Sequence, residues 1–144
     1  MRKSHDSRIG FSVVIVVNLL LGCQIARGDF GFGEPVPVPI LNSASADMSP
    51  SITADGLELY FASNRGHGAD LCYSDIWVAT RASTDGPWDT PRNLGAPVNR
   101  PEGADINPCI SADGLELYFS GPWGGFIQGC TFRPGGYGFS DIWV

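Results

Sequence analysis

The sequence has few of the residues on which nucleic-acid and catalytic sites depend. Lysine occurs once, at Lys3, and the arginines after residue 22 are scattered rather than clustered. Because proteins bind phosphate backbones through basic patches, this scarcity argues against a nucleic-acid partner. It argues equally against an anionic membrane surface, so any attachment to a membrane must come from a leader or a lipid anchor.

Histidine is also scarce, since the chain has two and His67 is the one that follows residue 28. A histidine base needs a nucleophile and an orienting acid nearby. Asp70 is close in the sequence, but no elbow-type serine accompanies it, and an exposed loop histidine is the simpler interpretation. No catalytic constellation stands out, so we expect neither an enzyme nor a cofactor.

The four cysteines lack Cys-x-x-Cys spacing, which disfavours a cysteine metal site. Acidic residues outnumber basic residues by 15 to nine, and the net charge is −6 at pH 7. Residues 1–22 carry a net charge of +2, so their removal would bring the net charge to −8. An acidic chain of this kind most simply indicates solubility.

The first 28 residues have the organisation of a secretory leader. Basic residues come first, and an apolar run over 9–21 follows, too short for a comfortable membrane span. A lipobox-like Leu-Leu-Gly-Cys would make Cys23 the lipidated N-terminus, whereas the small residues Ala26 and Gly28 allow ordinary cleavage before Asp29. Either site predicts an exported protein, located in the periplasm, in the outer envelope as a lipoprotein, or outside the cell.

The most informative feature present is an internal repeat. Residues 49–61 and 107–119 are nearly identical at an offset of 58 positions. The tetrapeptide Asp-Ile-Trp-Val also occurs twice, at 75–78 and 141–144. A long-period repeat indicates stacked copies of one supersecondary unit. We therefore divide the chain into a leader, a first repeat and a second repeat (1–28, 29–98 and 99–144).

Each repeat predicts short antiparallel strands. The Asp-Gly pairs at 55–56 and 113–114 lie between β-rich runs, a strong hairpin signal because such turns need positive φ. Large apolar residues alternate onto both faces, and no stretch after residue 28 has helical periodicity. This predicts an all-β protein made of four-stranded β-propeller blades. The strands expected in the first repeat cover 50–53, 57–62, a stretch from Asp75 onward, and 90–94.

Two longer motifs complete the pattern. The first reads Ser-Pro-Ser-Ile-x-x-Asp-Gly-Leu-x-Leu-Tyr-Phe-x-Ser-Asn-Arg, then a Gly-rich loop and Ser-Asp-Ile-Trp-Val; the second reads Pro-Trp-x-x-Pro-x-Asn-Leu-Gly at 87–95. Together they resemble the WD-like repeat of TolB-type β-propellers, exported multi-repeat proteins of bacteria, over about residues 33–144. The resemblance implies a non-catalytic scaffold that binds a protein or a glycan in the cell envelope.

The repeats amount to roughly one and a half to two blades, so we expect an incomplete ring. The second repeat stops at Val144, partway through its third strand, whereas a propeller needs about four blades to close. A truncated product is the leading interpretation, and self-assembly of short chains is the alternative if the chain is complete. An alternative function is a propeller hydrolase or lyase whose catalytic residues lie in missing blades.

The strand order of a blade places the loops 66–73, 99–107 and 121–139 on one rim. The last of these contains eight residues more than its counterpart in the first repeat. Exposed aromatic residues on a rim can stack on sugars or grip a peptide, or they can pack on one another to order the loop. The binding candidates are Trp123, Phe126, Tyr137, Arg65 and Arg133.

Three cysteines, Cys72, Cys109 and Cys130, are expected on the same rim. In an oxidising compartment, a pair among them predicts a disulfide. The pairing Cys109–Cys130 is favoured because both residues belong to one repeat and Cys130 lies in the enlarged loop. The pairing Cys72–Cys109 across adjacent blades is the alternative, and free thiols are the third interpretation.

Asp47 and Asp105 occupy matching positions just before the innermost strand of each repeat and are the candidates for a cation site. Calcium takes about six to eight oxygen ligands, more than two carboxylates supply. A turn-capping role is therefore the simpler expectation, and no metal is expected. Asp75 and Asp141, which open the third strands, are expected to hydrogen-bond to neighbouring backbone.

Overall fold

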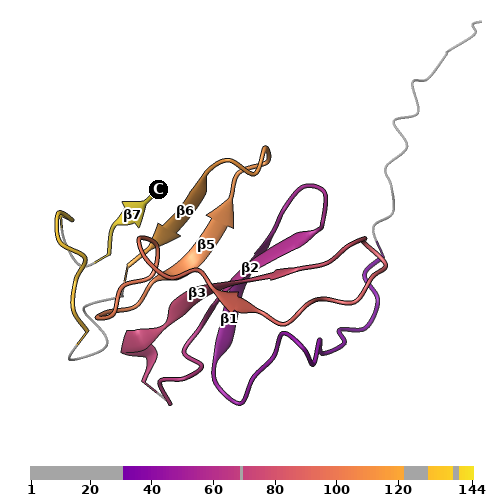
Figure 1. The fold of residues 1–144 in the computed structure, drawn as a ribbon, viewed down its shortest axis with the longest axis horizontal. Coiled ribbons are helices and arrows are strands. Elements are labelled where there is room, and N and C mark those ends of the chain that lie inside the picture. Colours follow the sequence, from indigo (N-terminus) through magenta and orange to yellow (C-terminus); the bar gives the residue numbers. More distant parts are fainter. Residues whose placement is uncertain (1–30, 69, 122–129, 138–139) are drawn as a thin grey trace, which may run out of the picture. The chain divides into compact units, whose positions relative to one another are not determined.

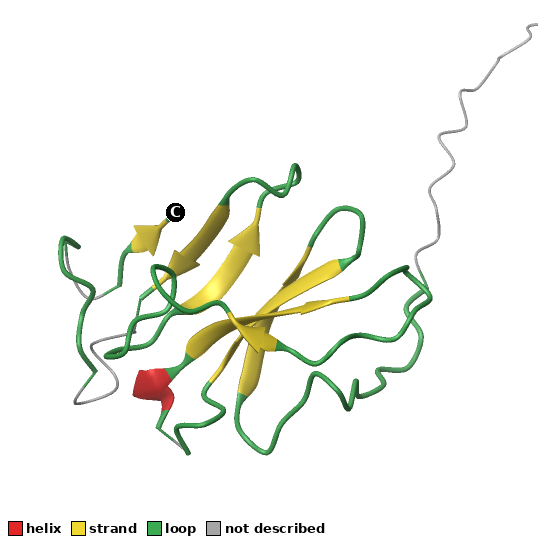
Figure 2. Cartoon of the chain, viewed as in Figure 1, coloured by secondary structure: helices red, strands yellow, loops and turns green. Residues whose placement is uncertain are grey.

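The computed structural model describes residues 31–68, 70–121, 130–137 and 140–144. The chain divides into two units, 1–34 and 35–144, and the strands that the structure describes all lie in the second unit. This unit is all-β, with two antiparallel sheets and a single turn of 3-10 helix, η1 (Leu71–Tyr73), among its described residues (Figures 1 and 2). The expected all-β class is thereby confirmed.

The two sheets follow the order of the chain. In the first sheet the strands lie in the order β1-β2-β3-β4, and in the second the order is β5-β6-β7, with every neighbouring pair antiparallel. The strands are β1 (Asp47–Ile52), β2 (Glu58–Ser63), β3 (Asp75–Thr80), β4 (Arg92–Asn93), β5 (Ile106–Ile110), β6 (Leu117–Ser120) and β7 (Ile142–Trp143). β1 begins three residues earlier than the sequence predicts, and β3 begins at the expected residue.

The Asp-Gly pairs form the expected turns. Gly56 and Gly114 both have a φ of +73°, a conformation that a residue with a Cβ adopts only under strain. Asp55 accepts hydrogen bonds from the Thr53 hydroxyl at 2.6 Å and from the Leu57 amide at 3.0 Å. The same bonds form in the second sheet around Asp113. Local chemistry therefore fixes these turns in the same way in both repeats.

A bulge interrupts the first strand of each sheet at an equivalent position. The register shifts between Met48 and Ser51 in one sheet and between Ile106 and Cys109 in the other. Inside the bulges, Ser49 and Asn107 have positive φ values of 52° and 54°, which non-glycine residues rarely adopt. The Ser49 hydroxyl donates to Asn107 Oδ1 at 2.8 Å, so the two bulges are joined directly.

The second sheet packs on one face of the first. The pairs Tyr60–Val78 and Ala62–Ile76 place these four side chains on the same face, and Ile76 and Val78 are 0% and 1% exposed. Strand β5 lies along this face, where the Ile110 amide donates to the Ser51 hydroxyl at 3.1 Å (Figure 1). The layer between the two repeats is therefore one part of the core of the unit, and Phe61 on the opposite face of the first sheet belongs to another.

Candidate functional site

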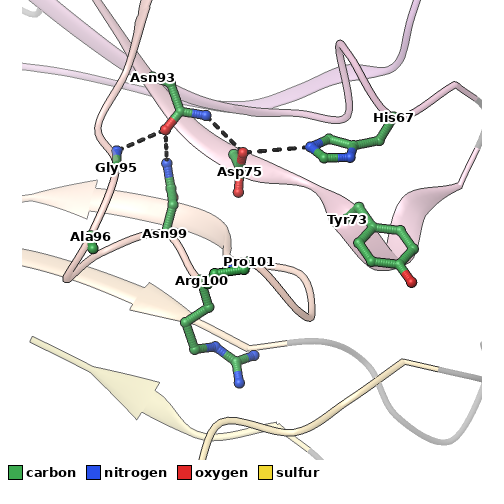
Figure 3. Close-up of a pocket in the computed structure, with 9 residues that line it drawn as sticks. All are labelled: His67, Tyr73, Asp75, Asn93, Gly95, Ala96, Asn99, Arg100 and Pro101. Carbon is green, nitrogen blue, oxygen red and sulfur yellow. Dashed lines mark hydrogen bonds and ion pairs between the residues drawn. The ribbon is translucent and has the colours of Figure 1, made fainter.

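The strongest candidate site is a pocket of about 280 Å³ at one end of the first sheet. In an antiparallel sheet, the end of β2, the start of β3 and the end of β4 all meet at the same edge. The segment 95–101, which leads toward the second sheet, closes the remaining side. The lining residues are His67, Tyr73, Asp75, Asn93, Gly95, Ala96, Asn99, Arg100 and Pro101 (Figure 3).

A chain of side-chain amides holds the floor of the pocket in place. Asn93 donates to Asp75 Oδ2 at 2.7 Å, and its own Oδ1 accepts from the Asn99 side chain and the Gly95 amide, both at 2.7 Å. Asn99 in turn exchanges hydrogen bonds with both backbone groups of Ile76 at 2.8 Å. The geometry of Asp75 is therefore tied to two strands and to the following loop.

His67 and Tyr73 form the aromatic wall of the pocket. Their ring centroids are 5.6 Å apart and their planes differ by 19°, so the rings are stacked. His67 Nε2 lies 3.9 Å from Asp75 Oδ2, and Figure 3 shows the imidazole pointing at this carboxylate. Both rings are partly exposed at the pocket mouth. A ligand could therefore contact a flat aromatic surface and a carboxylate at once.

Burial raises the pKa of the Asp75 carboxyl above its ordinary value of 3.8, although the Asn93 hydrogen bond and the charge of His67 oppose the shift. Asp70 is the acidic residue close to His67 in the sequence, but its carboxylate accepts from the Cys72 amide at 2.9 Å and caps η1. Asp75 was expected to bond to backbone; it accepts from the Asn93 side chain instead. Sequence proximity did not indicate this arrangement, because Asn93 comes from another strand.

Two of the predicted binding residues, Arg65 and Arg133, lie in equivalent, partly buried clusters. Arg65 binds Asp47 at 2.6 Å and stacks its guanidinium 5.0 Å from the ring centroids of both Phe61 and Trp77. It also donates to the Leu41 carbonyl at 2.6 Å. These contacts use its charge and its flat surface inside the protein, so Arg65 is committed to the fold rather than presented to a ligand.

Arg133 repeats this arrangement in the second sheet. It binds Asp105 at 2.9 Å and lies 4.9 Å from the Phe119 ring and 5.2 Å from the Trp143 ring. It also donates to the carbonyls of Pro97 and Val98, in the segment that precedes β5. The sequence did not show this equivalence directly, because Arg133 lies farther from its aspartate than Arg65 does. The Gly-rich stretch that follows each arginine was the signal that could have revealed it.

Asp47 and Asp105 therefore bind arginines. Burial opposes ionisation of Asp47, but hydrogen bonds from Ser63, Arg65 and Ser43 outweigh it and hold the pKa of Asp47 below its ordinary value of 3.8. Asp105 is 0% exposed and accepts from the Arg100 amide at 2.9 Å in addition to Arg133. Within the described ranges, no group of three or more histidine, cysteine or acidic residues could hold a metal ion.

The disulfide corrects the sequence expectation. Cys72 pairs with Cys130, and Cys109 on β5 is free and exposed. The favoured pairing Cys109–Cys130 is wrong, and so is the alternative Cys72–Cys109. The reason is that Cys72 and Cys130 both lie between the second and third strands of their sheets, and these loops meet where the sheets stack. Cys109 lies within a strand and does not belong to the loops of the rim.

The remaining candidates have different positions. Tyr137 is fully exposed in the loop before β7. Trp123, Phe126 and the lipidation candidate Cys23 lie outside the residues that the structure describes. In the part of the chain that is described, no helix has the length and apolar character needed to span a bilayer.

Comparisons of the chain with protein-family models, with curated proteins and with solved structures give no match. The site must therefore be interpreted from its own chemistry. The pocket offers a stacked aromatic pair, one half-buried carboxylate and, in its floor, amide groups that are already hydrogen-bonded within the protein.

Proposed function

We propose that the protein is an exported, non-catalytic scaffold of the β-propeller type, in which each sheet is one blade, and that it binds a glycan of the cell envelope in the pocket beside His67. The duplicated strand unit and its resemblance to TolB-type repeats support the propeller assignment. So does the packing of the second sheet on an apolar face of the first, since a blade buries both faces between neighbours.

Export is supported by the leader-like N-terminus and by the disulfide. Disulfides persist in oxidising compartments such as the periplasm and the cell exterior, and they are rare in the cytosol. Cys72–Cys130 joins the loops of the two repeats beside the pocket, so an oxidised state keeps this part of the rim together. A location in the periplasm, at the outer envelope or outside the cell follows from this proposal.

The single observation that carries the ligand assignment is the stacked pair of His67 and Tyr73 against the Asp75 carboxylate. Sugar rings present apolar C–H faces that pack on aromatic rings, and their hydroxyls donate to carboxylates. A pocket of about 280 Å³ with an open mouth fits one or two sugar residues of a longer chain. A peptide would also need hydrogen-bond partners for its backbone donors and acceptors. The side-chain amides in the pocket floor do not provide them, because they are already hydrogen-bonded within the protein.

The test is binding of soluble oligosaccharides, with N-acetylglucosamine oligomers in the panel, measured by isothermal titration calorimetry. For a glycan that binds, we expect Tyr73→Ala to weaken affinity about tenfold, equal to about 1.4 kcal/mol. Tyr137→Ala is the matched control, because Tyr137 is exposed but does not line the pocket. If the wild type, Tyr73→Ala and Tyr137→Ala bind the glycan with equal affinity, the glycan binds outside this pocket. Release of shorter products during the titration would favour the hydrolase or lyase alternative.

A further inference from the structure

The Asp75 carboxylate is bound at one of its two oxygens. Oδ2 accepts from the Asn93 side chain at 2.7 Å, and both dashed lines that reach Asp75 in Figure 3 end on this oxygen. Among the residues that the structure describes, none donates a hydrogen bond to Oδ1, and the Asp75 side chain is only 15% exposed. An ionised carboxylate can accept about four hydrogen bonds over its two oxygens. Oδ1 is therefore able to accept from a group that a ligand brings.

The charge of this carboxylate also lacks a close partner. Within the described ranges no cationic group lies at hydrogen-bond distance from Asp75, since His67 Nε2 is 3.9 Å away. Arg100 lines the pocket too, but its Nε pairs with Asp105 at 3.8 Å, and Figure 3 shows its guanidinium pointing away from Asp75. Burial, and to a smaller extent the negative charge of Asp105, raise the pKa of Asp75 against the opposing effects of Asn93 and His67. A cation that entered the pocket would offset both costs.

We propose that the pocket recognises an amino sugar whose free ammonium group donates to Oδ1 of Asp75 while the C–H face of the sugar packs on Tyr73. This inference rests on the proposed function and names the class of glycan. The stacked rings of His67 and Tyr73 suit such a ligand, because the face of an aromatic ring attracts cations as well as C–H groups. The pocket therefore combines the two elements that an aminated sugar needs.

A sugar hydroxyl or an acetamido group could also donate to Oδ1, but neither carries a charge. A hydrogen bond between an ammonium and a carboxylate is about twice as strong as a neutral one, and it also neutralises a half-buried charge. The whole protein favours the same choice, because its net charge of −6 attracts cationic ligands and repels anionic ones. Free amino groups should therefore decide which glycan binds most tightly.

The test uses the full 144-residue chain and two oligosaccharides of equal length, an oligomer of glucosamine and the corresponding oligomer of N-acetylglucosamine. Isothermal titration calorimetry is run at a pH that keeps the sugar amines protonated. For the wild type, we expect the glucosamine oligomer to bind about tenfold more tightly than its acetylated counterpart.

Two isosteric variants separate a contact at Asp75 from general attraction by an acidic protein. Asp75→Asn keeps an oxygen that can accept from Asn93 but removes the charge, so it should bind the two oligomers with about equal affinity. Asp85→Asn is the matched control. It removes the same charge from an exposed turn outside the pocket and should keep the preference of the wild type.

The outcomes distinguish this inference from the proposed function. Tighter binding of the acetylated oligomer, weakened by Tyr73→Ala, would overturn the inference and leave glycan binding in this pocket intact. A preference for the glucosamine oligomer that persists in Asp75→Asn would show attraction by the whole protein and would overturn it too. If Tyr73→Ala changes the binding of neither oligomer, the inference is wrong, and the remaining oligosaccharides of the panel decide whether the pocket binds another glycan.

Discussion

Asp47 in the first sheet and Asp105 in the second each bind an arginine that stacks on a phenylalanine and a tryptophan. In the first sheet the arginine follows the aspartate by 18 residues, and in the second it follows by 28. The loop that carries Arg133 is longer, yet the guanidinium reaches the same place. The comparison shows that the same aspartate–arginine pair forms at this point in both sheets, although loops of different length supply the arginine.

The two clusters differ in burial, and this difference gives the largest expected effect. The Asp105 side chain is 0% exposed and the Asp47 side chain 13% exposed. Asp105→Ala removes a fully buried carboxylate that holds both the Arg133 side chain and the Arg100 amide, so we expect the free energy of unfolding to fall by about 3–5 kcal/mol. Asp47→Ala should cost less, about 1–3 kcal/mol. Urea denaturation of the two variants measures both values, and equal losses would contradict the distinction.

The disulfide that links the two repeats should give the next largest effect. Cys72 and Cys130 are 58 residues apart, and closing a loop of that length stabilises a protein by about 4 kcal/mol in the chain-entropy model. Cys72→Ser should therefore lower the free energy of unfolding by about 2–4 kcal/mol under oxidising conditions. Cys109→Ser is the matched control and should change it by less than about 0.5 kcal/mol. Peptide mapping of the oxidised protein identifies the bonded pair directly.

The smallest effect concerns a tyrosine–glutamate pair that occurs in both sheets. Tyr60 donates to Glu58 at 2.7 Å, and Tyr118 donates to Glu116 at 2.8 Å. Burial, together with the Glu58 hydrogen bond, raises the pKa of Tyr60 from 10.0 to about 12. A raised tyrosine pKa stabilises the folded state below pH 10, where the unfolded residue is also neutral. That contribution is lost as the pH rises toward 12.

We expect Tyr60→Phe to reduce the fall in melting temperature between pH 10 and about 12, because it removes the group that titrates. Tyr118→Phe should alter the profile less, since Tyr118 is exposed in the second sheet while Tyr60 faces β5. Thermal melts at each pH, with tyrosinate absorbance as the monitor of ionisation, provide the measurement. A larger change from Tyr118→Phe than from Tyr60→Phe would contradict the expectation that the tyrosine of the first sheet contributes more to the pH dependence.

Sequence reasoning succeeded where the determinants are local. The Asp-Gly turns depend on a glycine at positive φ and on an aspartate that bonds within two residues, so the sequence alone predicts them. Alternation of large apolar residues predicted strands that carry apolar side chains on both faces, as Tyr60 and Phe61 do in β2. The repeat itself predicted that the two sheets would have the same strand order, as far as the described strands extend.

Sequence reasoning failed where residues from different strands or different repeats meet. The pairing of Cys72 with Cys130 depends on how one sheet stacks on the other, which no local pattern encodes. The same holds for the pocket, where His67, Asp75, Asn93 and Asn99 come from a loop, two strands and the following segment. Arg65 and Arg133 were assigned to ligand binding because exposure was assumed, whereas the aromatic rings beneath them cannot be inferred from spacing.

The most direct test of the account is an NMR titration that follows the imidazole resonances during addition of the tightest-binding oligosaccharide. After the leader, His67 is the one histidine in the chain, so its signal reports on the pocket without assignment of the whole spectrum. We predict that the His67 resonance shifts with saturation in the wild type, and that Asp75→Asn weakens the binding that it reports. A His67 resonance that stays unchanged while the oligosaccharide binds would contradict the assignment of this pocket as the glycan site.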